Sequence, residues 1–289
     1  MKPWRVLSVA GSDTGGGAGI QGDLKTITVL GGFGMTVITA LTVQNTLGIR
    51  EIYELPPDFV ARQFDAVAED IGIEAVKTGM LVNRGIIEVV AQKIREYGIE
   101  KVVVDPVLAA KRGEILISND AIPFLMEGLL PLACVATPNI PEAEVLSGLL
   151  IASPGDMKKA AAIIHSSGAR NVVIKGGHLT GSDAEALDIL YDGSAFHEFR
   201  APRIDTKDIH GTGCAYSAAI ATFLAEGRSV LDAVAAAKAY ITAAIRNAWR
   251  LGKGQGPVNH LAPVLTREDR DPVVATTGKN NGRQKPAGG

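Results

Sequence analysis

Two glycine-rich segments could hold the phosphate groups of a ligand. The later one lies in "DIHGTGCAYSAAIATFLAEG" (Asp208 to Gly227), where Gly211, Thr212 and Gly213 run into a helix of small residues. Free backbone N–H groups at a helix start, together with the helix dipole, attract anions. Because no G-x-x-x-x-G-K-[ST] segment occurs in the chain, this loop is the predicted cradle for a phosphoryl group.

Cys214 follows this loop directly and is one of two cysteines in the chain. A helix start favours the thiolate, so we expect a lowered thiol pKa and a side chain that can accept the proton of an alcohol attacking phosphorus. The other interpretation is a small side chain that packs the helix onto the sheet. The G-T-G loop in front of Cys214 favours chemistry, whereas Cys134, inside an apolar run, is expected only to pack.

An earlier glycine-rich segment follows the strand-like run "RVLSVAG" and contains Gly17-Ala-Gly19-Ile-Gln-Gly22, a formal G-x-G-x-x-G. A dinucleotide site would also need an acidic residue at the end of the second strand, where Gln44 stands instead, so a dehydrogenase is disfavoured. These glycines serve either a tight turn alone or a backbone that closes on a ligand. In the second case Asp23, one turn into the following helix, is expected to accept a hydrogen bond from the ligand.

Charged side chains stand at the ends of other apolar runs. Asp105 closes "KVVVDPV", where a carboxylate is unfavourable unless it is used, so we expect it to hold Mg²⁺ through water or to help deprotonate the acceptor. Glu142, in "TPNIPEAE", either complements a helix dipole or joins Asp105 as an oxygen ligand of Mg²⁺. Lys175 ends a buried run, which favours a phosphate partner.

A further lysine lies on the apolar stripe of the last helical segment. Lys238 shares that stripe with Leu231, Val234, Ile241 and Ile245 at three- and four-residue spacing. Its ammonium group must either reach solvent along its own side chain or meet an anion. A nucleotide phosphate is one such anion, and the residues leave both interpretations open.

Short β-branched runs alternate with longer amphipathic segments, which is the pattern of a parallel sheet with helices on both faces. The expected strands are "RVLSVAG", "MTVITALTVQ", "AVKTGM", "KVVVDPV", "CVATPN" and "NVVIKGG". The expected helices are 59–70, 85–97, 119–130, 156–167, one opened by 211–213, and 229–251. The runs "ALDILYDG" and "SAFHEFRAP" predict an antiparallel hairpin at a sheet edge. The predicted class is α/β, with ligands at the carboxyl ends of the strands.

The composition of the chain argues against some classes of function. The net charge of −2 over 289 residues argues against a nucleic-acid binder, and no apolar run approaches the roughly 20 residues that span a bilayer. Two cysteines are too few for a disulfide framework, so a reducing cytoplasm is expected. Residues 1–266 are expected to form one domain, and the polar segment 267–289 is expected to be a disordered tail.

Six stretches in this order resemble the hydroxymethylpyrimidine/phosphomethylpyrimidine kinases of thiamine biosynthesis, a family of the ribokinase-like superfamily. These stretches are "VAGSDTGGGAGIQGDLKT", "VITALTVQNT", "VVVDPV", "TPNIPEAE", "IKGGH" and "DIHGTGCAYSAAIA". The resemblance covers the chain from about Val6 to Pro263. It implies a homodimer and an ATP- and Mg²⁺-dependent phosphorylation of 4-amino-5-hydroxymethyl-2-methylpyrimidine, then of its monophosphate.

The resemblance also assigns residues to three parts of the site. Substrate contacts fall on Gly11, Asp23, Gln44, Met80 and Val107. The anion hole falls on Gly211, Thr212 and Gly213, with Cys214 as the proposed base and Asp105 beside it. Nucleotide contacts fall on Asn139, Lys175, Thr206 and Lys238, and the metal falls to Asp105 and Glu142.

Two other functions stay open from the sequence. A pyridoxal kinase of the same fold would act on a similar hydroxymethyl group, although the amide of Gln44 suits an aminopyrimidine edge because it can both donate and accept. A pyrimidine sensor without chemistry would need neither Asp105, Lys175 nor Cys214.

Overall fold

Among the residues that the structure describes, nine strands form one sheet in the order β3-β2-β1-β4-β5-β6-β7-β8-β9. The structure is a computed structural model, and it describes residues 3–109, 116–177 and 185–262. In these ranges the strands are β1 (Arg5–Ser12), β2 (Phe33–Asn45), β3 (Gly48–Glu54), β4 (Ala75–Thr78), β5 (Val102–Val104), β6 (Val135–Ala136), β7 (Val172–Lys175), β8 (Glu185–Tyr191) and β9 (Phe196–Pro202).

The middle of the sheet is parallel and both margins are antiparallel. Strands β2, β1, β4, β5, β6 and β7 pair in parallel, whereas β3 pairs antiparallel with β2, and β8 with both β7 and β9. The predicted α/β class and the β8–β9 hairpin are therefore confirmed. Strand β3 was not predicted, because its sequence "GIREIYE" is mostly polar and its side chains are largely exposed.

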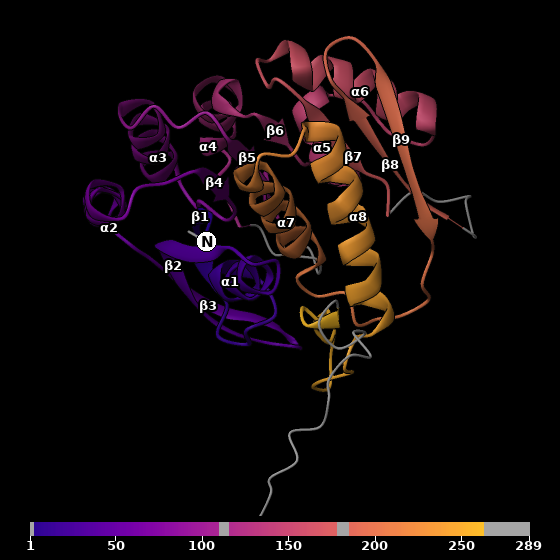
Figure 1. Cartoon of the computed structure of the whole chain (residues 1–289), viewed down its shortest axis with the longest axis horizontal. Coiled ribbons are helices and arrows are strands. Elements are labelled where there is room, and N and C mark those ends of the chain that lie inside the picture. The colour runs from indigo at the N-terminus through magenta and orange to yellow at the C-terminus, as the bar shows by residue number, and fades with distance from the viewer. Residues whose placement is uncertain (1–2, 110–115, 178–184, 263–289) are drawn as a thin grey trace, which may run out of the picture.

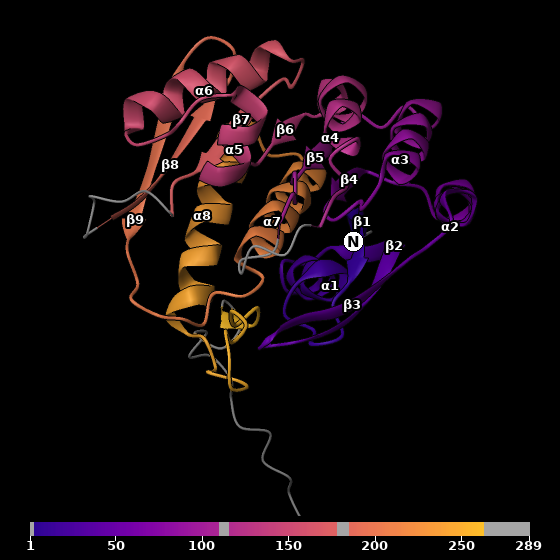
Figure 2. The same ribbon diagram turned by 180° about the vertical axis from the view of Figure 1, so that it is seen from behind.

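Helices cover both faces of the sheet (Figures 1 and 2). One face carries α1 (Gly19–Val29), α7 (Thr212–Glu226) and α8 (Val230–Arg246), with α7 and α8 side by side. The other face carries α2 (Pro57–Asp70), α3 (Arg84–Glu96), α4 (Ala121–Phe124) with the turns η1 (Leu125–Leu129) and η2 (Leu130–Leu132), α5 (Ile140–Ser147) and α6 (Pro154–Ser166).

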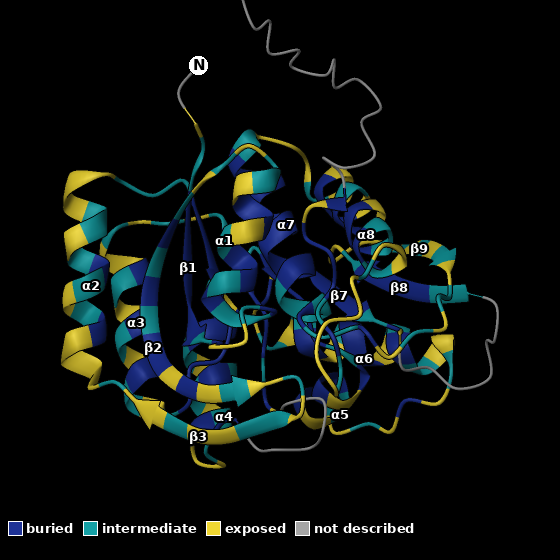
Figure 3. Cartoon of the chain, turned by 90° about the horizontal axis from the view of Figure 1, so that it is seen from below, coloured by how far each residue is buried: buried dark blue, intermediate teal, exposed yellow. Residues whose placement is uncertain are grey.

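Alternate residues of the central strands belong to two hydrophobic cores, one on each face of the sheet. On β1, Val6 packs toward α7 and α8, while Leu7 packs toward α2 and α3. Both side chains are fully buried, which explains why the central strands read as continuous apolar runs rather than as alternating ones. Figure 3 shows the result: α7 is almost wholly buried between the sheet and its neighbours, whereas α2 exposes one side.

Two predicted helices differ from the structure. The segment 119–130 is a short α-helix that widens into a π turn at Leu125–Leu129 and is followed by a 3₁₀ turn, where Pro131 cannot donate to a regular ladder. Helix α8 ends at Arg246 rather than at Leu251. The Asn247 amide donates to the carbonyl of Ala243, and Arg250 has a φ of 56°, which a helix does not allow.

The predicted tail, 267–289, lies outside the described residues. Within the described ranges, no helix combines the length and the apolar composition that a membrane span requires.

Candidate active site

A cavity of about 1090 Å³ opens at the carboxyl ends of the parallel strands. Parallel strands bring their ends to one edge of the sheet, so residues far apart in sequence meet there. The cavity is lined by fourteen of the predicted site residues, namely Gly11, Gln44, Met80, Asp105, Val107, Asn139, Glu142, Lys175, Thr206, Gly211, Thr212, Gly213, Cys214 and Lys238. Asp23 is the one predicted site residue that does not line it.

The start of α7 presents free backbone donors to this cavity. No carbonyl of the described residues accepts the N–H groups of Gly213 and Cys214, as expected for the first turn of a helix. Gly211 has a φ of 82°, and a Cβ at this position would overlap the carbonyl oxygen of Gly17, so only glycine fits. A Cβ at Gly213 would lie 3.4 Å from Lys175 Nζ, so the missing side chain leaves room beside a cation.

The thiol of Cys214 lies at the cavity wall, half-buried, but its electrostatics differ from the prediction. Burial raises the pKa of Cys214 to about 11, although the charge of Lys77 and a hydrogen bond from the Gly19 backbone both act to lower it. The expected lowering of the thiol pKa is therefore wrong, because desolvation of the thiolate outweighs the helix dipole. At neutral pH the side chain is a thiol.

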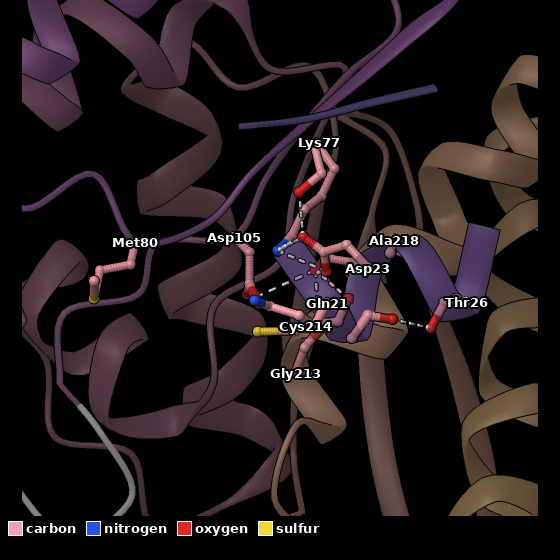
Figure 4. Close-up of polar contacts among 12 residues, drawn as sticks. Gln21, Asp23, Thr26, Lys77, Met80, Asp105, Gly213, Cys214 and Ala218 are labelled. Carbon is pink, nitrogen blue, oxygen red and sulfur yellow. Dashed lines mark hydrogen bonds and ion pairs between the residues drawn. The ribbon is translucent and has the colours of Figure 1, made fainter. Parts of the chain in front are cut away.

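Asp23 lies beneath the cavity instead of facing it. Its carboxylate accepts two hydrogen bonds from Lys77 Nζ, at 2.8 and 3.1 Å, and one from Ser8 Oγ at 2.5 Å. The Asp23 and Lys77 side chains are both fully buried, and Figure 4 shows this ion pair near Cys214. Although burial alone lowers the pKa of Lys77, the charge of Asp23 raises it overall, so Lys77 is protonated, whereas burial raises the pKa of Asp23 against the opposing charge of Lys77. The predicted ligand contact of Asp23 is replaced by this buried ion pair.

Asp105 is the centre of a second polar cluster. Its Oδ1 accepts from Lys175 Nζ at 2.7 Å and from Thr137 Oγ1 at 3.1 Å, and its Oδ2 accepts from Ser217 Oγ at 3.2 Å. Burial acts to raise the pKa of Asp105, but the charges of Lys175 and Lys77 bring it below its ordinary value. The carboxylate is therefore charged at neutral pH and holds Lys175 toward the start of α7.

Glu142 has the structural role that was one of its two predicted roles. Asn139 Oδ1 accepts from the Glu142 N–H at 2.9 Å, and Glu142 Oε2 accepts from the Asn139 N–H at 2.8 Å, which is a capping box at the start of α5. Burial raises the pKa of Glu142 to about 7, against the opposing charge of Lys175. This carboxyl group is thus poised between its two protonation states.

Lys238 meets an anion, but that anion is a carboxylate. Its Nζ lies 2.8 Å from Asp188 Oδ2, and Asp188 Oδ1 accepts from the Gly176 N–H at 3.0 Å. Thr206 Oγ1 accepts from the Asp208 N–H at 3.1 Å and closes the turn before the anion loop. Lys238 and Thr206 remain at the cavity wall, where a nucleotide can reach them.

One polar pair escaped the sequence analysis. Asp13 accepts hydrogen bonds from the N–H groups of Gly15, Gly17 and Ala18 at 2.8 to 3.1 Å, and from His210 Nε2 at 2.8 Å. Burial acts to raise the pKa of Asp13, but the bonds to His210 and to the backbone lower it overall. The pair joins the first glycine segment to the anion loop. Its signal in the sequence was an aspartate two residues before a glycine run, which favours an Asx-type turn.

The predicted Mg²⁺ site has only two protein ligands, Asp105 and Glu142. In the described ranges, no group of three or more His, Cys, Asp or Glu side chains could hold a metal ion. Asp105 and Glu142 both line the cavity and offer the oxygen atoms that Mg²⁺ prefers, but Asp105 already binds Lys175. These residues fit an ion that is held mainly by phosphate oxygens and water.

Solved structures share this architecture. The pyridoxal kinase of Bacillus subtilis, solved as an ADP complex, superposes with a TM-score of 0.84 at 39% identity, over 91% of this chain and all of that chain. The phosphomethylpyrimidine kinase of Clostridium difficile superposes with a TM-score of 0.74 at 41% identity, over 83% of this chain and 98% of that chain. The chain therefore has the ribokinase-like fold of these kinases.

The family follows from the sequence comparisons. A family model of phosphomethylpyrimidine kinases matches residues 13–259, and the chain belongs to that family. It is 47% identical to the hydroxymethylpyrimidine/phosphomethylpyrimidine kinase of Bacillus subtilis, over 91% of this chain and 96% of that protein. It is also 55% identical to the thiamine biosynthesis bifunctional protein of Geobacter sulfurreducens, over 92% of this chain but only 54% of that longer protein.

Proposed function

We propose that this chain transfers the γ-phosphoryl group of ATP to the hydroxymethyl group of an aminopyrimidine, and then to the resulting monophosphate, for thiamine biosynthesis. The observation that carries the proposal is the meeting of three features in one cavity: the free N–H groups of Gly213 and Cys214, the Asp105–Lys175 pair and the Gln44 amide. The family membership of the chain and the names of its relatives support the same activity.

The phosphate end of the cavity is assigned to the nucleotide. Asn139, Lys175, Thr206 and Lys238 line it, and the ADP complex of the related pyridoxal kinase supports ATP as the donor. Lys175 would neutralise the transferred phosphoryl group, while the N–H groups at the start of α7 stabilise its equatorial oxygens. When bound, Mg²⁺ would add charge between the phosphates, with Asp105 and Glu142 holding its water ligands.

The thiolate form of Cys214 is proposed as the group that accepts the acceptor's proton. Lys77 and the Gly19 backbone both stabilise its thiolate, although burial keeps the resting side chain protonated. In a loose transition state the acceptor loses its proton late, when bonding to phosphorus has made it acidic. Asp105 is charged and nearby, but Lys175 and Ser217 already donate to it, so it is assigned to positioning Lys175.

Gln44 is assigned to the polar edge of the aminopyrimidine. The wall beside the ring is assigned to Gly11, Met80 and Val107. The Gln44 Oε1 accepts from Thr42 Oγ1 at 3.1 Å, which orients the amide. We expect Gln44→Leu to raise the KM for the pyrimidine by about 5- to 100-fold, because the polar ring edge then loses its partner. Steady-state kinetics with each substrate varied in turn would measure this. The KM for ATP in the same variant is the control, and an unchanged pyrimidine KM would contradict the assignment.

The direct test of the function is an assay with ATP and the free pyrimidine that separates the monophosphate from the diphosphate. ADP release that depends on the pyrimidine would exclude a sensor without chemistry. Pyridoxal is the second candidate acceptor, since a pyridoxal kinase superposes closely on this chain. Comparing kcat/KM for the two alcohols would choose between them, and a higher value for pyridoxal would overturn the proposal.

We also propose that the chain works as a homodimer in a reducing cytoplasm. An apolar row of Leu41, Val43 and Tyr53 is exposed on the β2–β3 margin of the sheet, and such a patch is typical of a protein interface. Cys134 and Cys214 are both free thiols. Light scattering is expected to give twice the chain mass of 30.2 kDa, and Val43→Asp is expected to shift the mass toward a monomer. A monomeric wild type would contradict the dimer.

A further inference from the structure

The second phosphorylation poses a geometric problem that the first does not. The acceptor is then a phosphate monoester, so one phosphate must lie between the pyrimidine ring and the incoming phosphoryl group. A monoester is nearly a dianion at neutral pH, with a second pKa of about 6. Such an anion needs a donor or a cation between Gln44, at the ring, and the start of α7.

The obvious cations are already committed elsewhere. Lys77 is fully buried against Asp23 and does not line the cavity. Lys175 and Lys238 are paired with Asp105 and Asp188 at the end assigned to the nucleotide. The amides of the first glycine segment cannot serve, because Asp13 accepts those of Gly15, Gly17 and Ala18.

His210 stands in the required place. It lines the cavity and directly precedes Gly211, and its Nε2 lies 3.5 Å from the Gln44 amide nitrogen. Because Nε2 bonds to Asp13, it must carry a proton, and the contact with Gln44 is then one between two donors. The Cδ2–Nε2 edge of the ring faces Gly17 and Asp13, so Nδ1 is turned away from them.

The His210 side chain has one ring nitrogen available to a ligand. Its Nδ1 has no hydrogen-bond partner among the described residues, and the side chain is 22% exposed. The Asp13 carboxylate lies 2.8 Å from the ring, and burial lowers the pKa of the neighbouring His260 to about 4, so that side chain is neutral. With Asp13 as counter-ion, protonation of Nδ1 would supply a charged donor to an anion in the cavity.

We propose that the Asp13–His210 pair is the binding subsite for the phosphate of a phosphomonoester acceptor. His210 Nδ1–H donates to a phosphate oxygen, and Asp13 holds the ring and balances its charge. In the reaction, a monoester oxygen bonds to the γ-phosphorus, the bond from that phosphorus to the β-γ bridging oxygen breaks, and ADP leaves. The dianionic acceptor has no proton to lose. The subsite rests on the proposed function and adds to it the means of accepting the second substrate.

The test compares the two steps separately in the full-length chain. We expect His210→Gln to lower kcat/KM for the monophosphate by about 10- to 100-fold, mostly through KM, because a charge-assisted hydrogen bond is lost. For the free pyrimidine we expect a decrease of less than about 5-fold. The matched control is His197→Gln, which breaks a histidine–aspartate pair of the same length, 2.8 Å to Asp192, on the β8–β9 hairpin away from the cavity.

The outcomes separate the proposals. If wild type phosphorylates neither acceptor, the proposed function fails; if wild type phosphorylates both and His210→Gln lowers both equally or neither, only the subsite fails. Should His210→Gln not fold, ¹⁵N-histidine NMR of wild type decides. Binding of the monophosphate, but not of the free pyrimidine, is expected to favour the protonated form of one imidazole. The signal of that imidazole should persist in variants that replace each of the other four histidines. An unchanged imidazole spectrum would overturn the subsite.

Discussion

Replacing Cys214 by alanine is expected to lower kcat for the alcohol acceptor by about 10²- to 10⁴-fold, which is the usual contribution of a positioned base. The KM for ATP should stay within a few-fold, because the N–H groups at the start of α7 and the Lys175 side chain remain in place. The monophosphate acceptor should lose much less, since it reaches the site already deprotonated. Cys214→Ala is therefore expected mainly to slow the first phosphorylation, and His210→Gln mainly the second.

The pH profile gives an independent measurement of the same role. The Cys214 pKa of about 11 lies far above neutrality, so the thiolate fraction of the free chain rises about tenfold for each pH unit below that value. We expect kcat/KM for the alcohol to rise with pH from 6.5 to 9 in wild type, and to lose that slope in Cys214→Ala. Turnover of the alanine variant within a few-fold of wild type, or a flat wild-type profile, would show that the thiol is not the base.

The largest expected effect on stability comes from the buried Asp23–Lys77 pair. Asp23→Leu leaves the Lys77 ammonium in an interior from which water is excluded, and removing one partner of a buried pair costs about 3–5 kcal/mol in the free energy of unfolding. The double variant Asp23→Leu/Lys77→Met removes both charges, and we expect it to recover to within about 1 kcal/mol of wild type. Urea unfolding would measure both changes.

Stability and activity should separate in that double variant. The charge of Lys77 favours the Cys214 thiolate and the charge of Asp23 opposes it, with Lys77 the stronger of the two. We therefore expect the double variant to fold but to phosphorylate the alcohol more slowly than wild type. The control is Asp58→Asn, which breaks the exposed pair with Arg62 and should leave the free energy of unfolding close to that of wild type. A double variant as unstable as Asp23→Leu would show that the lost packing, and not the unpaired charge, destabilises the chain.

Local sequence patterns determined most of the architecture. The continuous apolar runs predicted the central parallel strands, because a strand covered on both faces has no polar side. The Gly-Ser turn predicted the β8–β9 hairpin. By contrast, β3 is a polar edge strand that forms only because β2 offers it unpaired backbone groups, and "GIREIYE" carries no comparable signal. The segment 119–130 was predicted as one regular helix, and only the structure showed its irregular turns.

The candidate site shows the same division between sequence and structure. Residue types at strand ends and helix starts, together with the family resemblance, indicated which side chains meet, and fourteen of those predicted residues do line one cavity. Charge partners were decided by the tertiary structure alone. Asp23 pairs with Lys77 beneath the cavity, and Lys238 pairs with Asp188. Burial raises the pKa of Cys214, where a lowered value was expected. Desolvation and pairing depend on the whole surroundings of a group, and no local spacing records those surroundings.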